Sequence, residues 1–167
     1  MEQELETKTP SKSNRQLLAY GSRESNQFPG KDSTTSKPID ISKFLTSIPH
    51  QVYQIACGGL HTLILTTNGL VYSFGNNESG ALGRTGDANK PGKVELDVTV
   101  DMISAGQSHS VACNSEGAII YQWGTYNNFT RTELSKTKVP ERIGATDIKK
   151  KKINKLLSGE NHTLVLA

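Results

Sequence analysis

The chain has 167 residues, of which 34% are hydrophobic, and a formal net charge of +3, so it can bury one ordinary core. It contains no long apolar run and no secretory leader, so we expect a nuclear or alternatively cytoplasmic protein without a membrane span. The two cysteines, Cys57 and Cys113, are far apart in the sequence and do not support a zinc site or a disulfide framework, and we expect both to be buried thiols in strands.

The first segments of the chain have no helical period. Residues 1–16 are polar and are expected to be disordered, and residues 17–49 resemble the later strands of a repeat. Residues 50–98 form a full repeat with four expected strands, which are Val52–Cys57, Thr62–Thr66, Leu70–Phe74 and Lys93–Leu96. The Asn68-Gly69 pair between the second and third strands predicts a tight hairpin turn.

The remaining segments repeat this plan. Residues 99–148 form a second full repeat, and residues 149–167 correspond to the first strands of another. One residue more than in the preceding repeat lies within residues 118–123, which predicts a β-bulge there. The loop at 125–134 also departs from the plan, because it lacks the glycines found at the same place in the preceding repeat.

A glycine and a histidine three residues later recur with a period of about fifty residues. The pairs are Gly58 and His61, Gly106 and His109, and Gly159 and His162. Aromatic-glycine pairs recur with a similar period, at Tyr20-Gly21, Phe74-Gly75 and Trp123-Gly124. A residue needed once per repeat is architectural, so we expect core histidines that bind no metal and do no catalysis, and we expect the aromatic rings to pack between repeats. Four short strands in each repeat predict an all-β propeller, with about three blades' worth present and the ring incomplete.

These motifs resemble the regulator of chromosome condensation family, whose members are seven-bladed propellers. The resemblance rests on Gly-x-x-His-Thr/Ser, on the hairpin at residues 68–75 and on Asn77-Glu78-Ser79-Gly80-Ala81-Leu82-Gly83. The Trp-Asp dipeptide of WD repeats is absent, and the double glycine of kelch repeats occurs only at Gly58-Gly59. The resemblance implies no cofactor and no small-molecule substrate.

Within this family the chain is most similar to members that exchange the nucleotide of the small GTPase Ran. The resemblance implies that the atypical loop acts as a wedge against a Ran-type GTPase, through Tyr126, Asn127, Asn128, Phe129, Thr130 and Arg131. It also implies a polar surround from the loops that precede two of the histidines, at Gln107, Ser108, Glu160 and Asn161. Such exchange involves no covalent chemistry.

One feature favours a different function. The Ran exchange factor carries acidic residues where this chain has Gln107 and Asn161, and their loss favours a scaffold or a recognition domain, for example in a ubiquitin ligase.

The half repeats at the two ends of the chain are complementary but bring the total to only three blades. We interpret this as a truncated chain, with a homodimeric six-bladed ring as the alternative.

Basic residues concentrate between Arg131 and Lys155. This stretch contains nine basic and three acidic residues, a net charge of +6, and the rest of the chain has a net charge of −3. The peak at Lys149–Lys152 is typical of a nuclear-localisation signal or of a surface that binds histones or DNA. A solvated loop between two strands is the simpler interpretation.

Overall fold

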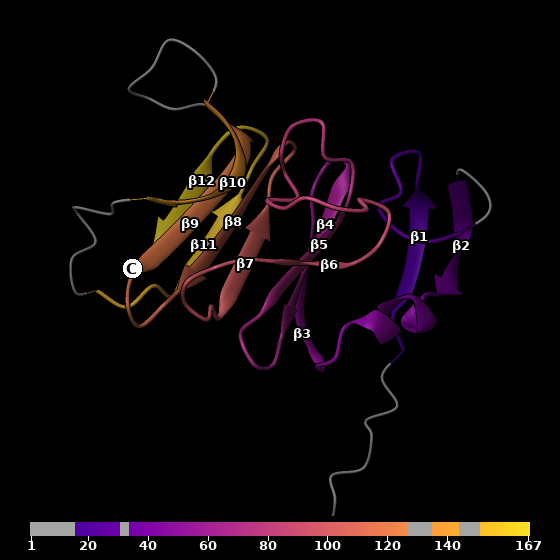
Figure 1. Ribbon diagram of the computed structural model, residues 1–167, viewed down its shortest axis with the longest axis horizontal. Helices are drawn as coiled ribbons and strands as arrows, with labels where there is room; N and C mark the ends of the chain where they lie inside the picture. The colour runs from indigo at the N-terminus through magenta and orange to yellow at the C-terminus, as the bar shows by residue number, and fades with distance from the viewer. Residues whose placement is uncertain (1–15, 31–33, 127–134, 144–150) are drawn as a thin grey trace, which may run out of the picture.

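The computed structural model describes residues 16–30, 34–126, 135–143 and 151–167 (Figure 1). Two four-stranded antiparallel sheets form its centre. The first has the order β3 (Val52–Cys57), β4 (His61–Thr66), β5 (Val71–Gly75) and β6 (Gly92–Val94). The second has the order β7 (Met102–Ala105), β8 (His109–Asn114), β9 (Ile119–Tyr126) and β10 (Ser135–Ile143).

A two-stranded sheet lies at each end of this pair. One consists of β1 (Leu18–Ser22) and β2 (Thr34–Asp40), and the other of β11 (Lys155–Ser158) and β12 (Thr163–Leu166). A six-residue 3₁₀ segment, η1 (Ser42–Ser47), leads from β2 into the first full sheet. The all-β propeller with an incomplete ring is therefore confirmed.

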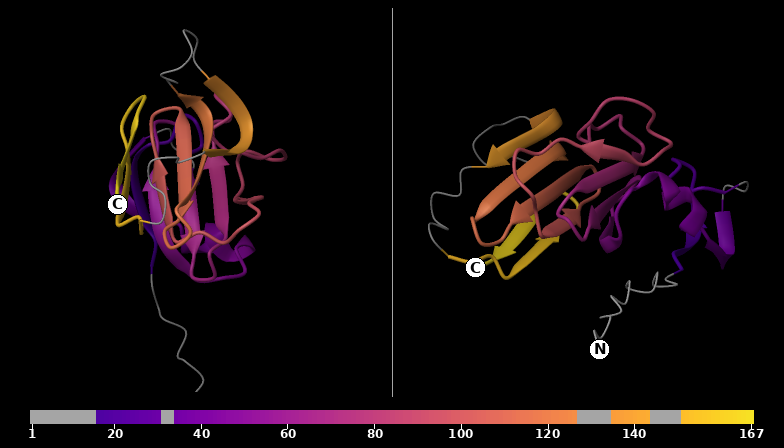
Figure 2. Two further views of the ribbon diagram at one scale, coloured as in Figure 1. Left: turned by 90° about the vertical axis from the view of Figure 1, so that its left-hand side faces the viewer. Right: turned by 60° about the horizontal axis from the view of Figure 1, so that its bottom comes forward.

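The sheets stand side by side in an arc, with β1–β2 at one end and β11–β12 at the other (Figures 1 and 2). The first strands of successive sheets, β3, β7 and β11, are neighbours in this arc. The Gln54 side chain in β3 links two of them, because its amide donates to the Ile103 carbonyl at 2.9 Å and accepts from the Ile103 amide at 3.0 Å. The first full blade is thus held to the second at its inner edge by these two hydrogen bonds.

The two hairpin turns explain a wrong prediction. At Asn68-Gly69 the expected tight turn forms: Gly69 has φ +79° and its amide donates to the Thr66 carbonyl at 3.0 Å. In the second sheet β8 and β9 pair without a register shift from His109↔Gly124 to Asn114↔Ile119, so the predicted bulge is absent. The additional residue is absorbed by the turn instead, where Ala118 takes φ +48°. A longer turn keeps the strand ladder intact, which an internal bulge would not.

The core lies between the sheets. The Trp123 ring on β9 is fully buried in a cluster with Leu63 and Val71 of the preceding sheet, and its Nε1 donates to the Ala81 carbonyl at 2.8 Å. Phe74 packs edge-on against Phe44 of η1, with ring centroids 5.1 Å apart. These two aromatic rings pack between repeats as predicted, whereas the equivalent Tyr20 is 70% exposed.

The two cysteines differ from each other. Cys113 is buried in β8 as predicted, but Cys57 at the end of β3 is exposed, so that prediction was wrong for Cys57. Cys57 lies on the side of β3 that faces β1, where the described residues supply no full neighbouring sheet. A residue at this position is covered only when a complete blade precedes it.

Candidate partner-binding face

The three Gly-x-x-His segments have one geometry. In each, the glycine amide donates to the carbonyl of the histidine three residues later, at 2.9 Å for Gly58 and 2.8 Å for Gly106 and Gly159. A Cβ on Gly106 would lie 2.1 Å from His109 Cε1 and 2.6 Å from the Gly159 carbonyl oxygen. Only glycine fits at this position, because the imidazole lies over the loop on one side and the backbone of the next blade lies on the other.

The histidines connect neighbouring blades. His61 Nε2 lies 2.8 Å from Ser110 Oγ in the next sheet, and Ser110 Oγ itself donates to the Ala81 carbonyl at 2.8 Å. Since the hydroxyl hydrogen is used there, His61 is the donor and carries its proton on Nε2. His109 Nε2 lies 3.2 Å from Thr163 Oγ1, which repeats the arrangement one blade further along.

Burial keeps these imidazoles neutral. It is the main cause that lowers the pKa of His61 to about 4, with a smaller contribution from His109. Burial also lowers the pKa of His109, although the Glu160 backbone carbonyl, which accepts from the protonated imidazole, opposes the shift. Among residues 16–30, 34–126, 135–143 and 151–167, no three His, Cys, Asp or Glu side chains are placed to bind a metal ion. The geometry of His61 and His109 is that of connections between blades.

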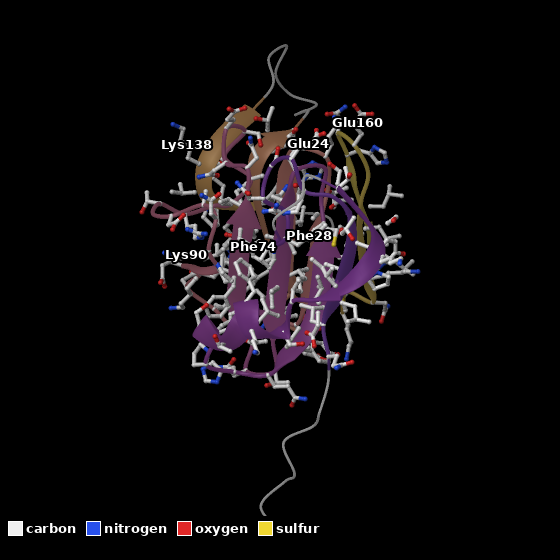
Figure 3. All side chains as sticks on the ribbon, turned by 90° about the vertical axis from the view of Figure 1, so that its right-hand side faces the viewer. Glu24, Phe28, Phe74, Lys90, Lys138 and Glu160 are labelled. Atoms are coloured by element: carbon white, nitrogen blue, oxygen red, sulfur yellow. The ribbon has the colours of Figure 1, made fainter. Side chains whose placement is uncertain are left out.

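The loops before the histidines meet at one end of the sheets. Gln107 and Glu160 line a hollow of about 360 Å³ together with Gly59, and these three occupy the same position in successive repeats. Figure 3 shows Glu160 at the upper end of the molecule. Ser108 and Asn161 follow them in the chain, half-buried and exposed respectively, and do not line the hollow.

The base of the atypical loop lies at the same end. The Thr125 amide donates to the Ser108 carbonyl at 2.8 Å, so the end of β9 is bound to one of the histidine loops. Tyr126 is 9% exposed, with its ring centroid 6.4 Å from that of His109. Its buried side chain therefore fixes where the loop leaves the sheet. The other proposed wedge residues, Asn127, Asn128, Phe129, Thr130 and Arg131, lie outside the described residues.

The sequence motifs alone did not reveal the role of Arg84. Its guanidinium donates to the carbonyls of Ser73, Asp87 and Lys90 at 2.8, 3.1 and 2.7 Å, which ties the long loop after β5 to the sheet. Burial lowers the pKa of Arg84, but the arginine keeps its charge. The sequence signal that could have indicated this role is a lone arginine in a glycine-rich loop, because the backbone carbonyls of such a loop need hydrogen-bond donors.

The described part of the basic stretch is exposed. Lys138, Arg142, Lys151 and Lys155 are open to solvent, and Lys152 pairs with Glu116 at 2.5 Å. The peak residues Lys149 and Lys150 lie outside the described ranges. Within the described ranges, no helix has the length and apolar character needed to cross a membrane.

Comparison with known proteins identifies the repeats. Models of the regulator of chromosome condensation (RCC1) repeat match residues 52–81 and 68–113. The regulator of chromosome condensation of Homo sapiens is 37% identical over 131 residues, which is 73% of this chain and 30% of that protein. The E3 ubiquitin-protein ligase HERC2 of Homo sapiens is 31% identical over 157 residues, which is 90% of this chain and 3% of the ligase.

A solved structure shows the same architecture. Prp20p of Saccharomyces cerevisiae, solved in a study of its binding to Gsp1p and histones, superimposes with a TM-score of 0.73 at 24% identity, over 89% of this chain and 38% of Prp20p. The chain thus spans between 3% and 38% of the length of these relatives. Repeat matches, relatives and architecture agree, and the chain is a stretch of β-propeller that belongs to the regulator of chromosome condensation family.

Proposed function

We propose that this chain contributes the GTPase-facing surface of a nucleotide exchange factor for a Ran-type small GTPase. The observation that carries the proposal is the hydrogen bond from the Thr125 amide to the Ser108 carbonyl. It brings the base of the atypical loop and the polar loops before the histidines to one end of the propeller. A loop that starts beside a polar rim suits a wedge that opens the nucleotide site of a partner.

The residues of the loop have different roles in this proposal. Tyr126 holds the loop base against His109. Phe129 and Arg131 supply the contacts with the GTPase. Gln107 and Glu160 around the hollow, with Ser108 and Asn161 beside it, form the polar surround. The surface acts by binding the nucleotide-free GTPase better than the loaded one, and a 10⁴-fold faster release corresponds to about 5.5 kcal/mol of barrier.

The relatives support this reading at the level of partner class. The regulator of chromosome condensation of Homo sapiens matches most of this chain, and Prp20p has been studied for binding to Gsp1p and histones. We extend the proposal to histones or DNA at the basic stretch, which includes the exposed Lys138, Arg142 and Lys151, and to a nuclear location.

Release of a fluorescent GDP analogue from Ran tests the exchange activity. The 167-residue chain should accelerate release, and Phe129→Ala or Arg131→Ala should reduce the acceleration by roughly tenfold or more. Tyr53→Ala is the matched control, because Tyr53 is 67% exposed on β3, away from this loop. Release at the spontaneous rate, with no binding to nucleotide-free Ran, would contradict the proposal.

A second candidate is a propeller that binds partners without exchanging nucleotide. The match to a ubiquitin ligase and the lack of carboxylates at Gln107 and Asn161 favour it. The variants Gln107→Asp and Asn161→Asp separate the two functions. An exchange factor should become faster, whereas a scaffold should bind nucleotide-free Ran weakly or not at all and release no GDP in either form.

Histone or DNA binding is tested separately. Replacing Lys149–Lys152 by alanine should weaken binding to histones or duplex DNA and reduce its salt dependence. Replacing Lys37, Lys43 and Lys90 by alanine removes exposed positive charge elsewhere and serves as the control. Equal binding by both variants would show that the stretch is only a solvated loop.

A further inference from the structure

The stem of the atypical loop is separated from the rest of its sheet. The stem consists of residues 124–126 of β9 and 135–137 of β10, which pair with each other. Next to it, residues 138–140 of β10 lie opposite the single residue Trp123 of β9, which is a β-bulge. A bulge bends a strand and interrupts the ladder. Pairing within the sheet therefore does not by itself fix the direction in which the stem leaves the blade.

A loop of the preceding blade lies along the β9 side of this stem. This supporting loop consists of residues 76–83 and follows β5. Thr125 Oγ1 donates to the Ser79 carbonyl at 3.1 Å. A Cβ on Gly124 would lie 3.2 Å from the Ala81 Cα, so the two backbones are in close contact there.

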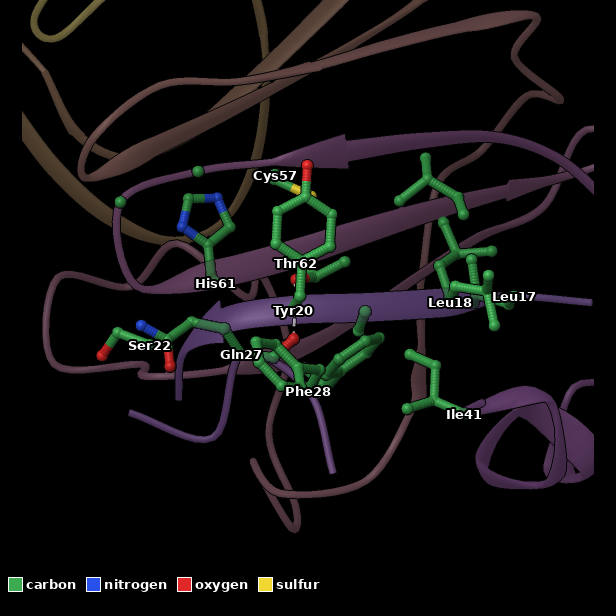
Figure 4. Close-up of a pocket in the computed structure, with 16 residues that line it drawn as sticks. Leu17, Leu18, Tyr20, Ser22, Gln27, Phe28, Ile41, Cys57, His61 and Thr62 are labelled. Carbon is green, nitrogen blue, oxygen red and sulfur yellow. Dashed lines mark hydrogen bonds between the residues drawn. The ribbon is translucent and has the colours of Figure 1, made fainter. Parts of the chain in front are cut away.

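The preceding interface between blades offers an internal comparison. There Thr62 Oγ1 donates to the Gln27 carbonyl at 2.9 Å (Figure 4). The Ala81 carbonyl accepts the equivalent bond at the next interface, from the serine that corresponds to Thr62. Gln27 therefore corresponds to Ala81, and the residues before them, Asn26 and Gly80, correspond to each other.

The comparison shows how closely β10 approaches the supporting loop. Asn26 and Gly80 both have positive φ, at +58° and +81°. Asn26 has room for a whole side chain, which donates to Asn89 Oδ1 at 2.8 Å. By contrast, a Cβ on Gly80 would lie only 2.7 Å from the Thr137 carbonyl oxygen. The supporting loop thus contacts both strands of the stem, and on the β10 side it leaves no space for a side chain.

The supporting loop is itself held firmly. Asn77 Oδ1 accepts from the Leu82 amide at 3.0 Å, and Asn77 Nδ2 donates to the Arg84 carbonyl at 3.2 Å. Ala81 and Leu82 are 0% exposed. A loop with its own hydrogen bonds and a buried end can fix the position of a neighbouring segment.

We infer that the supporting loop sets the direction in which the stem leaves the propeller, which makes Ser79 and Gly80 positioning residues for nucleotide exchange. The support rests on the contacts with Thr125 and Thr137, and its role in exchange rests on the proposed function. Neither Ser79 nor Gly80 has to touch the GTPase. A displacement of about 1 Å in a functional group can cost about a hundredfold in rate, so the direction of the stem matters.

A pair of glycine variants tests the support. Gly80→Asn adds a side chain where β10 leaves no space, and asparagine tolerates positive φ, so backbone strain stays small. Gly86→Asn is the matched control: its φ is +93°, and the nearest atom to an added Cβ is Arg84 Nη1 at 3.8 Å. Amide hydrogen exchange in residues 124–126 and 135–137 should become about tenfold faster in Gly80→Asn and stay unchanged in Gly86→Asn.

A milder pair of variants covers the case in which Gly80→Asn fails to fold. Thr125→Val removes only the hydrogen bond to Ser79 and should make amide exchange in the stem about fivefold faster. Thr46→Val is the matched control, because it removes the same kind of bond, to the Lys43 carbonyl in η1. Thr125→Ser keeps the hydroxyl and should restore the parent behaviour.

Release of GDP at increasing concentrations of Ran separates positioning from folding. Per folded chain, a fraction that the fluorescence of Trp123 reports, Thr125→Val should lower kcat by about fivefold. KM should change by less than about twofold, because the polar loops still bind the GTPase. Thr125→Ser and Thr46→Val should keep the parent kcat.

Two results would overturn the inference. One is amide exchange in the stem that is unchanged in both Gly80→Asn and Thr125→Val. The other is faster exchange in the stem with the kcat of the parent, since the direction of the stem would then not matter. A parent chain that releases no GDP contradicts the proposed function instead, and amide exchange still decides whether the loop supports the stem.

Discussion

His61 Nε2 and Ser110 Oγ lie 2.8 Å apart, although the two residues are 49 positions apart in the chain and belong to different sheets. Both side chains are buried, at 1% and 0% exposure. The Ser110 hydroxyl donates a hydrogen bond to the Ala81 carbonyl, which also accepts one from the Trp123 indole. One buried network therefore joins four segments of two neighbouring repeats.

Removing this connection should destabilise the chain. We expect His61→Ala to lower the free energy of unfolding by about 3 kcal/mol, since it leaves a cavity and an unpaired hydroxyl, and Ser110→Ala to cost about 1–3 kcal/mol. The double variant should cost less than the sum, by about 1 kcal/mol. Urea unfolding followed by the fluorescence of Trp123, the single tryptophan, measures it. His50→Ala is the control, and strict additivity would contradict the connection.

Stability should fall as the pH falls from about 7 to about 4. The pKa of His61 is about 4 in the folded chain and about 6.5 when unfolded, so between these values the unfolded chain binds the extra proton. The loss amounts to about 3 kcal/mol for His61, and the lowered pKa of His109 acts in the same direction.

Asp40 and Asp87 lose their contribution only at lower pH, because hydrogen bonds depress the pKa of each carboxyl below 3.8. Unfolding measured between pH 4.5 and 7 therefore isolates the histidines. His61→Asn should flatten the curve in that range. An unchanged slope would show that His61 is protonated in the folded chain.

A methyl group on the motif glycine should not be tolerated. Gly106→Ala places its Cβ 2.1 Å from His109 Cε1 and 2.6 Å from a backbone oxygen of the next blade, so we expect a loss of about 3 kcal/mol or more. In Gly30→Ala the nearest atoms belong to the Arg23 side chain at 3.1 Å, which can move, so this control should cost little. Thermal unfolding compares them. Equal melting temperatures would contradict the packing argument.

The loop that Arg84 holds should open when the guanidinium is replaced. Arg84→Lys keeps the charge but cannot serve the carbonyls of Ser73, Asp87 and Lys90 together, so amide hydrogen exchange in residues 76–91 should speed up by about tenfold. Lys90→Ala breaks only an exposed pair with Asp87 and should change exchange little. Equal rates of amide exchange in Arg84→Lys and the parent chain would show that the loop keeps its conformation without the guanidinium.

Local sequence rules predicted the strands of the complete blades well. The Asn68-Gly69 turn was right because glycine is needed where φ is positive. The extra residue before Trp123 was assigned to the wrong place, because the residue count is the same for a bulge and for a longer turn. Cys57 was misjudged because its burial depends on a neighbouring blade.

The candidate site was less predictable. The sequence could propose Gln107, Ser108, Glu160 and Asn161 and the loop beginning at Tyr126, but spacing alone does not say that they share one end of the propeller. The bond from Thr125 to Ser108 does. Tyr126 is buried against His109, which alternation along a strand did not indicate.

The sequence by itself determined the repeat, its strands and its turns, since these depend on φ angles and side-chain alternation within a few residues. The tertiary structure decided which hydroxyl each histidine meets, because that contact forms only when two blades stand side by side. It alone showed that residues 76–83 lie along the base of the atypical loop, since a contact between two repeats is a property of neighbours in space.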